Sequence, residues 1–295
     1  MSKMPPVCDY EGSDYRTRFW ENQGRNYEDR VERIALRRLM PPTGSTLIDI
    51  GAGFGRIADE YKGYEKVVLF DYSSSLLREA KERLGDDPRF VYVAGNWYEM
   101  PFVSGLFQTM VQLRTIHHAA NVPDLFVELS RIQRTNGRYI LEFANKLNLK
   151  AIARYALRKQ TWSPFTREPI EFTELNFDFH PKWIDEQLKQ AGFAPQKMLT
   201  VSHFRIALLK RIIPTNILVK LDSYAQLTGN LWQLSPSVFV QNHGPRHGQI
   251  AADNEFFACP KCKTAIFESG QQLACPTCDV TWVKRAGVYD FKEPA

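Results

Sequence analysis

The chain has no long apolar run. None of its hydrophobic segments approaches the roughly 20 residues needed to span a bilayer. The first six residues, Met1 to Pro6, lack the apolar core of a secretory signal peptide. The 295 residues are 44% hydrophobic and 24% charged, which fits one large soluble domain plus a small one. We therefore expect a cytoplasmic protein with no membrane partner.

Three alternating glycines follow the first strongly apolar segment. Residues 47–50 include Asp49 and read as a buried strand; Gly51, Gly53 and Gly55 come next, before a helix-like segment at 57–61. Such a turn lets a ligand approach the backbone amides. A dinucleotide loop would place its third glycine where Arg56 stands. A second apolar segment ends in Asp71, well placed to accept hydrogen bonds from ribose hydroxyls.

This pattern resembles the class I S-adenosylmethionine (SAM) dependent methyltransferases. Residues 91–97 with 100–102 match the third strand and adenine-binding turn of that family, residues 110–118 match the fourth strand, and residues 137–143 match the fifth. The resemblance covers roughly the first 145 residues. It implies an α/β, Rossmann-like fold with a mostly parallel seven-stranded sheet and helices on both faces.

The resemblance also implies a set of cofactor-binding residues. Asp49 and the glycine loop would hold the methionine part of SAM, and Asp71 would bind the ribose. The family usually has Asp where this chain has Asn96, whose carbonyl can still accept a hydrogen bond from the adenine amine. The full implied set is Asp49, Gly51, Gly53, Gly55, Asp71, Tyr72, Asn96, Trp97 and Leu113.

Methyl transfer from a sulfonium depends chiefly on the placement of the acceptor and on its protonation. A hydroxyl acceptor needs a base, whereas a carboxylate does not. His117 and His118 end the fourth strand, and either could be that base; alternatively, they only shape the pocket or cap the following turn. The chain has no Asn-Pro-Pro-Tyr or Asp-Pro-Pro-Tyr motif, which disfavours the amino-group methylation that uses it.

Four of the five cysteines form two Cys-x-x-Cys pairs with twelve residues between them, and the fifth, Cys8, stands alone. Four thiolates at this spacing predict a closed, structural zinc site, which would supply folding energy to a module of roughly 40 residues. Two disulfides or a redox pair are the alternatives. The predicted ligands are Cys259, Cys262, Cys275 and Cys278.

With residues 285–291, these pairs resemble the small zinc-binding activator of tRNA, rRNA and release-factor methyltransferases. We therefore predict a methyltransferase domain at 1–250 and a zinc ribbon at 251–295. Because the ribbon is fused, no separate activator subunit is expected.

The predicted methyltransferase domain has two further insertions, at about 145–180 and 205–236, expected to be helical at 148–160 and 217–227. Residues 146–220 carry thirteen Lys and Arg against six Asp and Glu. Lys150, Arg154 and Arg158 could follow a phosphate backbone or attract an anionic small substrate, or form an ordinary solvated helix face. The acceptor is not identified: RNA or a translation component is slightly favoured, with a small metabolite or a SAM-binding scaffold without turnover as alternatives.

The N-terminal region shows a helical pattern in which Val31, Ala35 and Leu39 share one face. Aromatic residues alternate with arginines between residues 15 and 27. The region is either a helix packed on the sheet or a lid over the cofactor.

Overall fold

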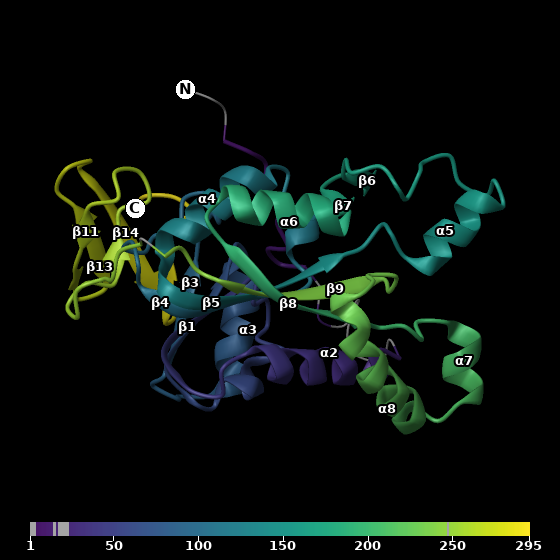
Figure 1. Cartoon of the computed structure of the whole chain (residues 1–295). Helices are drawn as coiled ribbons and strands as arrows, with labels where there is room; N and C mark the ends of the chain where they lie inside the picture. Colours follow the sequence, from purple (N-terminus) through teal and green to yellow (C-terminus); the bar gives the residue numbers. More distant parts are fainter. Residues whose placement is uncertain (1–3, 14–15, 17–23, 247) are drawn as a thin grey trace.

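The computed structural model describes residues 4–13, 16, 24–246 and 248–295. Seven strands form the predicted sheet in the order β3-β2-β1-β4-β5-β9-β8 (Figure 1). The first five are parallel, and β9 runs antiparallel to its two neighbours. The predicted α/β fold is confirmed. The bounds are β1 Gly44–Ile50, β2 Tyr64–Asp71, β3 Phe90–Ala94, β4 Phe107–Gln112, β5 Gln133–Ala144, β8 Ala194–Val201 and β9 Ser237–His243.

Helices cover both faces of this sheet (Figure 1). Because successive side chains of a strand point to opposite faces, Leu47 packs on one side while Ile48 and Ile50 pack on the other. The Leu47 side is covered by α2 (Asn26–Leu39), α3 (Ser74–Leu84) and α8 (Thr215–Ala225). The Ile48 side is covered by α4 (Val122–Ile132) and α6 (Pro181–Gln190). Burial on both faces explains why the strand sequences read as continuous apolar runs.

The C-terminal segment continues the sheet. Its strand β15 (Val288–Asp290) pairs in parallel with β3, and β14 (Val280–Arg285), β13 (Gln272–Cys275) and β12 (Glu268–Ser269) follow in order. A separate hairpin joins β10 (Phe257–Ala258) to β11 (Ala265–Ile266). We call residues 257–291 the ribbon. Strands from both sides of residue 250, the predicted domain boundary, therefore belong to one sheet. The ring of Phe257 also stacks on the ring of Phe102, with 6.1 Å between their centroids.

Several predicted elements differ from the structure. The glycine loop leads into a short 3-10 turn, η1 (Ala58–Tyr61), and not into a regular helix. The predicted helix at 148–160 is only α5 (Leu149–Ala156), because Arg158 has a left-handed φ of 55°. Lys150 and Arg154 therefore lie on the helix, whereas Arg158 lies beyond it. The sequence of residues 198–204 and 237–241 also predicts the last two strands of the sheet. In the structure the first of them, β8, begins and ends earlier, and the second, β9, extends to His243.

Only the first insertion departs from the helical structure expected for both, and the second is helical as predicted. The first contains a hairpin of β6 (Ile170–Thr173) and β7 (Asn176–Asp178). The second contains α7 (Ala207–Ile212), then α8, then the 3-10 turn η3 (Gln226–Asn230).

The N-terminal helical pattern forms α2, which packs on the sheet through Val31, Ala35 and Leu39. Most of the aromatic stretch before it, including Tyr15, Phe19 and Trp20, lies outside the described residues. No helix in the described part of the chain has the length and apolar character required to cross a membrane.

Candidate active site and cysteine cluster

A cleft lies where β1, β2 and β4 end. It consists of two adjoining cavities, which share Tyr10, Gly51, Asp71, Thr115 and His118. The first also contains Asp49, Gly53 and Leu113, whereas Gly55 lines neither cavity. The second also contains Tyr72, Gly95 and Trp97. Carboxyl ends of parallel strands are the usual ligand-binding edge of such a sheet.

The glycine loop needs glycine for two physical reasons. Gly51 has a φ of 74°, and a Cβ added there would lie 2.2 Å from Cγ2 of Thr115. The Gly51 and Ala52 amides both donate to the carbonyl of Phe70, at 2.8 and 3.0 Å. Gly53 also has a positive φ, but a Cβ there would meet only Leu76, at 4.0 Å. The loop is therefore fixed to the end of β2, and its open side faces the cleft.

The two acids of the sequence pattern both face the cleft, in different environments. Asp49 is 2% exposed, and its Oδ2 atom has no hydrogen-bond partner in the described structure. Burial raises the pKa of Asp49 to about 7. Asp71 is half-buried and accepts from the amides of Gly53 at 2.8 Å and Ser73 at 2.9 Å. Burial raises its pKa as well. At Asp49, burial outweighs the nearby positive charge of Arg56, so the charged form of the carboxylate is disfavoured.

Two arginines of the cleft were missed by the sequence reasoning. Arg56 and Arg114 both line the first cavity and both bind the buried carboxylate of Glu32 on α2, Arg114 Nε at 2.7 Å and Arg56 at 3.0 Å. Burial alone would raise the pKa of Glu32, but Arg114 and Arg56 outweigh that effect and hold it at about 2. Glu32 is 82 residues from Arg114 in sequence, so no local motif links them.

His118 lies in the cleft and His117 does not line either cavity. Nδ1 of His118 is 2.8 Å from the carbonyl oxygen of Leu175, which can only accept, so Nδ1 carries the proton. Nε2 is then the basic nitrogen, and it accepts from the hydroxyl of Tyr10 at 3.2 Å. Burial lowers the pKa of both histidines, that of His117 well below its usual value. His118 is consequently a neutral imidazole with an oriented lone pair.

The other predicted cofactor residues divide into two groups. Tyr72, Trp97 and Leu113 line the cleft, and the buried Nε1 of Trp97 has no partner in the described structure. Asn96 lines neither cavity, and its carbonyl oxygen accepts from the amide of Tyr98 at 2.9 Å. Its contact with adenine stays a prediction.

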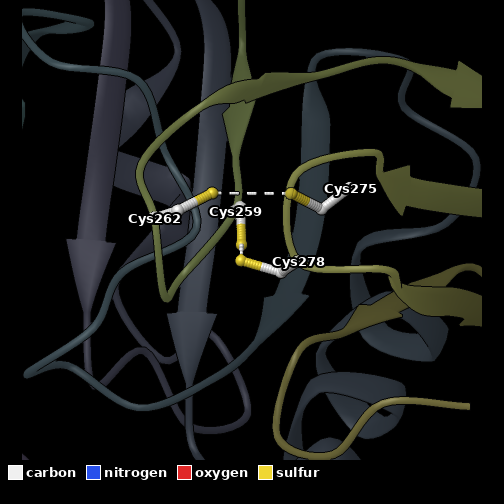
Figure 2. Close-up of side chains that lie close together, drawn as sticks. All are labelled: Cys259, Cys262, Cys275 and Cys278. Carbon is white, nitrogen blue, oxygen red and sulfur yellow. Dashed lines mark hydrogen bonds between the residues drawn. The ribbon is translucent and has the colours of Figure 1, made fainter.

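The four predicted zinc ligands lie together in the ribbon (Figure 2). Their sulfur atoms all lie within 4.8 Å of one another. The sulfurs of Cys259 and Cys278 are 3.9 Å apart, and those of Cys262 and Cys275 are 3.5 Å apart. Tetrahedral zinc with Zn–S bonds near 2.3 Å would place its sulfurs roughly 3.8 Å apart. The cluster fits that geometry, and its cysteines are free of disulfides.

Comparison with known proteins bears directly on the cleft. Residues 48–141, which include the glycine loop, Asp71 and His118, match the family model described as "Methyltransferase domain". This part of the chain is similar to a methyltransferase domain.

Among curated relatives, malonyl-[acyl-carrier protein] O-methyltransferase of Legionella pneumophila is 28% identical over 109 residues. That match covers 36% of this chain and 37% of the relative. The chain spans roughly a third of the length of the curated relatives it matches.

Solved structures share the fold of this chain. An S-adenosylmethionine dependent methyltransferase from Mesorhizobium loti has a TM-score of 0.53 and 19% identity, covering 74% of this chain and 100% of that one. A chain from the complex of the Haloferax volcanii Trm112 methyltransferase activator with a methyltransferase has a TM-score of 0.54 and 15% identity. It covers 79% of this chain and 98% of that one.

Proposed function

We propose that this protein transfers a methyl group from SAM to an acceptor that enters the cleft beside His118. The observation that carries this proposal is the unpartnered carboxylate oxygen of Asp49, which faces a cleft built on the matched methyltransferase domain. A buried carboxylate with a raised pKa favours a cationic ligand, because the cation restores its charged form.

The lining of the cleft fits each part of SAM. Asp49 would bind the methionine ammonium, and Arg56 and Arg114 would attract the methionine carboxylate. Asp71 keeps acceptor capacity for ribose hydroxyls beyond its two amide contacts. Trp97, Phe70 and Gly95 line a largely apolar part of the second cavity that suits adenine. Bound SAM supplies an activated methyl group, so the protein has only to position the acceptor and manage its proton.

We assign His118 as the base that receives the acceptor's proton. Its Nδ1 proton is held by the Leu175 carbonyl, which leaves the Nε2 lone pair available. The hydroxyl of Tyr10 on that nitrogen shows that an O–H donor can reach it. A hydroxyl acceptor could replace Tyr10 there and pass its proton to Nε2 of His118.

The acceptor that best fits this cleft is a small molecule or a narrow substituent. Tyr10 from the N-terminal segment lines both cavities, and the carbonyl of Leu175 on the β6–β7 hairpin contacts His118, so these two segments narrow the approach for a folded RNA surface. The similarity to a malonyl-[acyl-carrier protein] O-methyltransferase is a precedent for the size of such an acceptor, but a malonyl carboxylate would carry no proton for His118 to remove. RNA remains the competing acceptor because Lys150 and Arg154 are exposed on α5.

Calorimetric titration with SAM and with its demethylated product tests the cofactor. A radiolabelled methyl-transfer assay on metabolite, lipid and RNA extracts tests the acceptor. We expect SAM binding and label in a small-molecule fraction. SAM binding without label in any fraction would support a scaffold without turnover, and no SAM binding would refute the proposal.

Asp71→Ala is expected to weaken SAM binding by about 1.5–3 kcal/mol, because charged hydrogen bonds to the ribose are lost. That corresponds to roughly 10- to 150-fold in Kd by titration. Asp86→Ala, which removes an exposed carboxylate from the β2–β3 connection, is the matched control. Equal affinity of the Asp71 variant and the wild type would mean that Asp71 does not contact the ribose.

For the ribbon, we propose one structural zinc ion bound by Cys259, Cys262, Cys275 and Cys278. The four-thiolate donor set and the sulfur spacing support it. The ribbon would then act as a built-in activator, because it already forms part of the sheet next to the cleft.

A further inference from the structure

Exposed apolar side chains are concentrated in the two insertions. Of the eighteen large hydrophobic residues that are exposed in the described structure, fourteen lie between residues 149 and 232. Leu157, Leu208 and Ile212 are 64%, 63% and 67% exposed. Soluble proteins rarely gather so many apolar side chains on one region of the surface unless that region binds something.

One stretch of each insertion is strongly basic. Residues 149–160 and 206–221 contain no Asp or Glu, but they contain seven Lys and Arg. Lys210 pairs with Glu28 at 2.9 Å. The other six cations of these two segments have no ion pair in the described structure. They are Lys150, Arg154, Arg158, Lys159, Arg211 and Lys220. We call residues 149–160 and 206–221 the insertion surface.

Both halves of the insertion surface lie on the edge of the sheet that holds the cleft. The first follows the carboxyl end of β5. The second follows the carboxyl end of β8, which runs in the same direction as β5 because both are antiparallel to β9. Figure 1 shows α5 and α7 at one end of the molecule and the ribbon at the other. One flat partner could therefore contact both halves without touching the ribbon.

We propose that the insertion surface docks on an anionic lipid bilayer. Aliphatic side chains beside unpaired Lys and Arg are the features of segments that lie in the membrane interface. The cations would meet anionic headgroups while Leu157, Leu208 and Ile212 enter the apolar boundary. The contact would be peripheral and needs no membrane-crossing helix, so it differs from the expectation of no membrane partner that was drawn from the lack of a long apolar run.

Two other occupants fit the surface less well. Single-stranded RNA is bound mainly through aromatic and arginine side chains that stack on bases, whereas this surface is mostly Leu and Ile. A second copy of the chain would bring two basic surfaces together, and like charges repel.

Vesicle flotation of the full chain tests the proposal. We expect binding to vesicles of phosphatidylcholine mixed with phosphatidylglycerol, weaker binding at high salt, and little binding to phosphatidylcholine alone. The double variants L208S/I212S and K150Q/R154Q should each reduce the bound fraction by at least about tenfold. All four side chains are largely exposed, so the melting temperature should not change.

Val127→Ser is the matched control, because Val127 is 63% exposed but lies on α4, outside the insertion surface. It should bind vesicles like the wild type. The proposal would be overturned by equal binding to neutral and anionic vesicles, or by no vesicle binding. Binding to bulk tRNA that L208S/I212S leaves intact and K150Q/R154Q abolishes, without vesicle binding, would assign the surface to RNA instead. A dimer in light scattering that L208S/I212S converts to a monomer would assign it to self-association.

Discussion

Loss of the four-cysteine site is expected to unfold the ribbon and weaken SAM binding together. The change is the double substitution C259S/C275S, or removal of metal from the wild type by a chelator. Zinc binding in zinc-finger peptides contributes about 10–16 kcal/mol, as much as the whole stability of a typical domain. Elemental analysis should find about one zinc per wild-type chain and none in the variant. Hydrogen exchange should show loss of protection in β13 to β15.

The expected effect on SAM follows from how the ribbon joins the sheet. Phe291 donates its amide to the carbonyl of Ala94 at 2.8 Å, directly before Gly95 in the cleft. The hydroxyl of Ser74 donates to Asp290 at 3.0 Å, which ties the start of α3 to β15. An unfolded ribbon would remove both contacts and leave the edge of β3 unpaired. We therefore expect a higher Kd for SAM after metal removal.

Cys8→Ser is the control for metal content, since Cys8 lies outside the cluster and should leave the zinc stoichiometry unchanged. A metal-free wild type with four oxidised cysteines would refute the zinc proposal. A metal-free ribbon that leaves SAM affinity unchanged would refute only the coupling between ribbon and cleft.

The parts of the fold that could be predicted from sequence are those determined by neighbouring residues. The glycine loop, Asp49 and Asp71 lie at the ends of buried strands, so apolar runs and turn residues were sufficient to place them. The four cysteines could be placed because the spacing within and between the two Cys-x-x-Cys pairs is itself a local pattern.

The parts that were missed depend on contacts distant in sequence or on turns without the usual residues. The β6–β7 hairpin turns at Leu175, and α5 ends before Arg158; both residues have positive φ without being Gly or Asn. The pairing of β15 with β3 joins segments about 200 residues apart, and β15 has only three residues. His118 is oriented by Tyr10, which lies 108 residues away in the sequence, and by Leu175, which lies 57 residues away. No local pattern could have oriented that imidazole.

Replacing His118 is expected to give the largest loss of activity of any single change in the cleft. His118→Asn removes the basic Nε2 but keeps a polar side chain of similar reach. Positioned general bases contribute about 10²–10⁴-fold, so kcat in the methyl-transfer assay should fall by that factor. The Kd for SAM should change little, because Asp49, Asp71 and the glycine loop remain.

The pH profile provides a second readout. Burial lowers the pKa of His118 below its usual value, so the imidazole is neutral and active at and above pH 7. The wild-type kcat should be constant there and should fall in acid, by about tenfold for each pH unit below the lowered pKa. This acid limb should be absent from the residual activity of the Asn variant.

His117→Asn is the matched control, since its ring centroid is only 4.0 Å from that of His118 but it lines neither cavity. It tests whether any change in this turn lowers the rate. A similar loss in both variants would indicate a structural role for the turn. Unchanged kcat in the His118 variant would show that the acceptor carries no proton to remove, as for a carboxylate, and His118 would then only shape the cleft. A large loss confined to His118, together with the acid limb, would identify an acceptor that must be deprotonated.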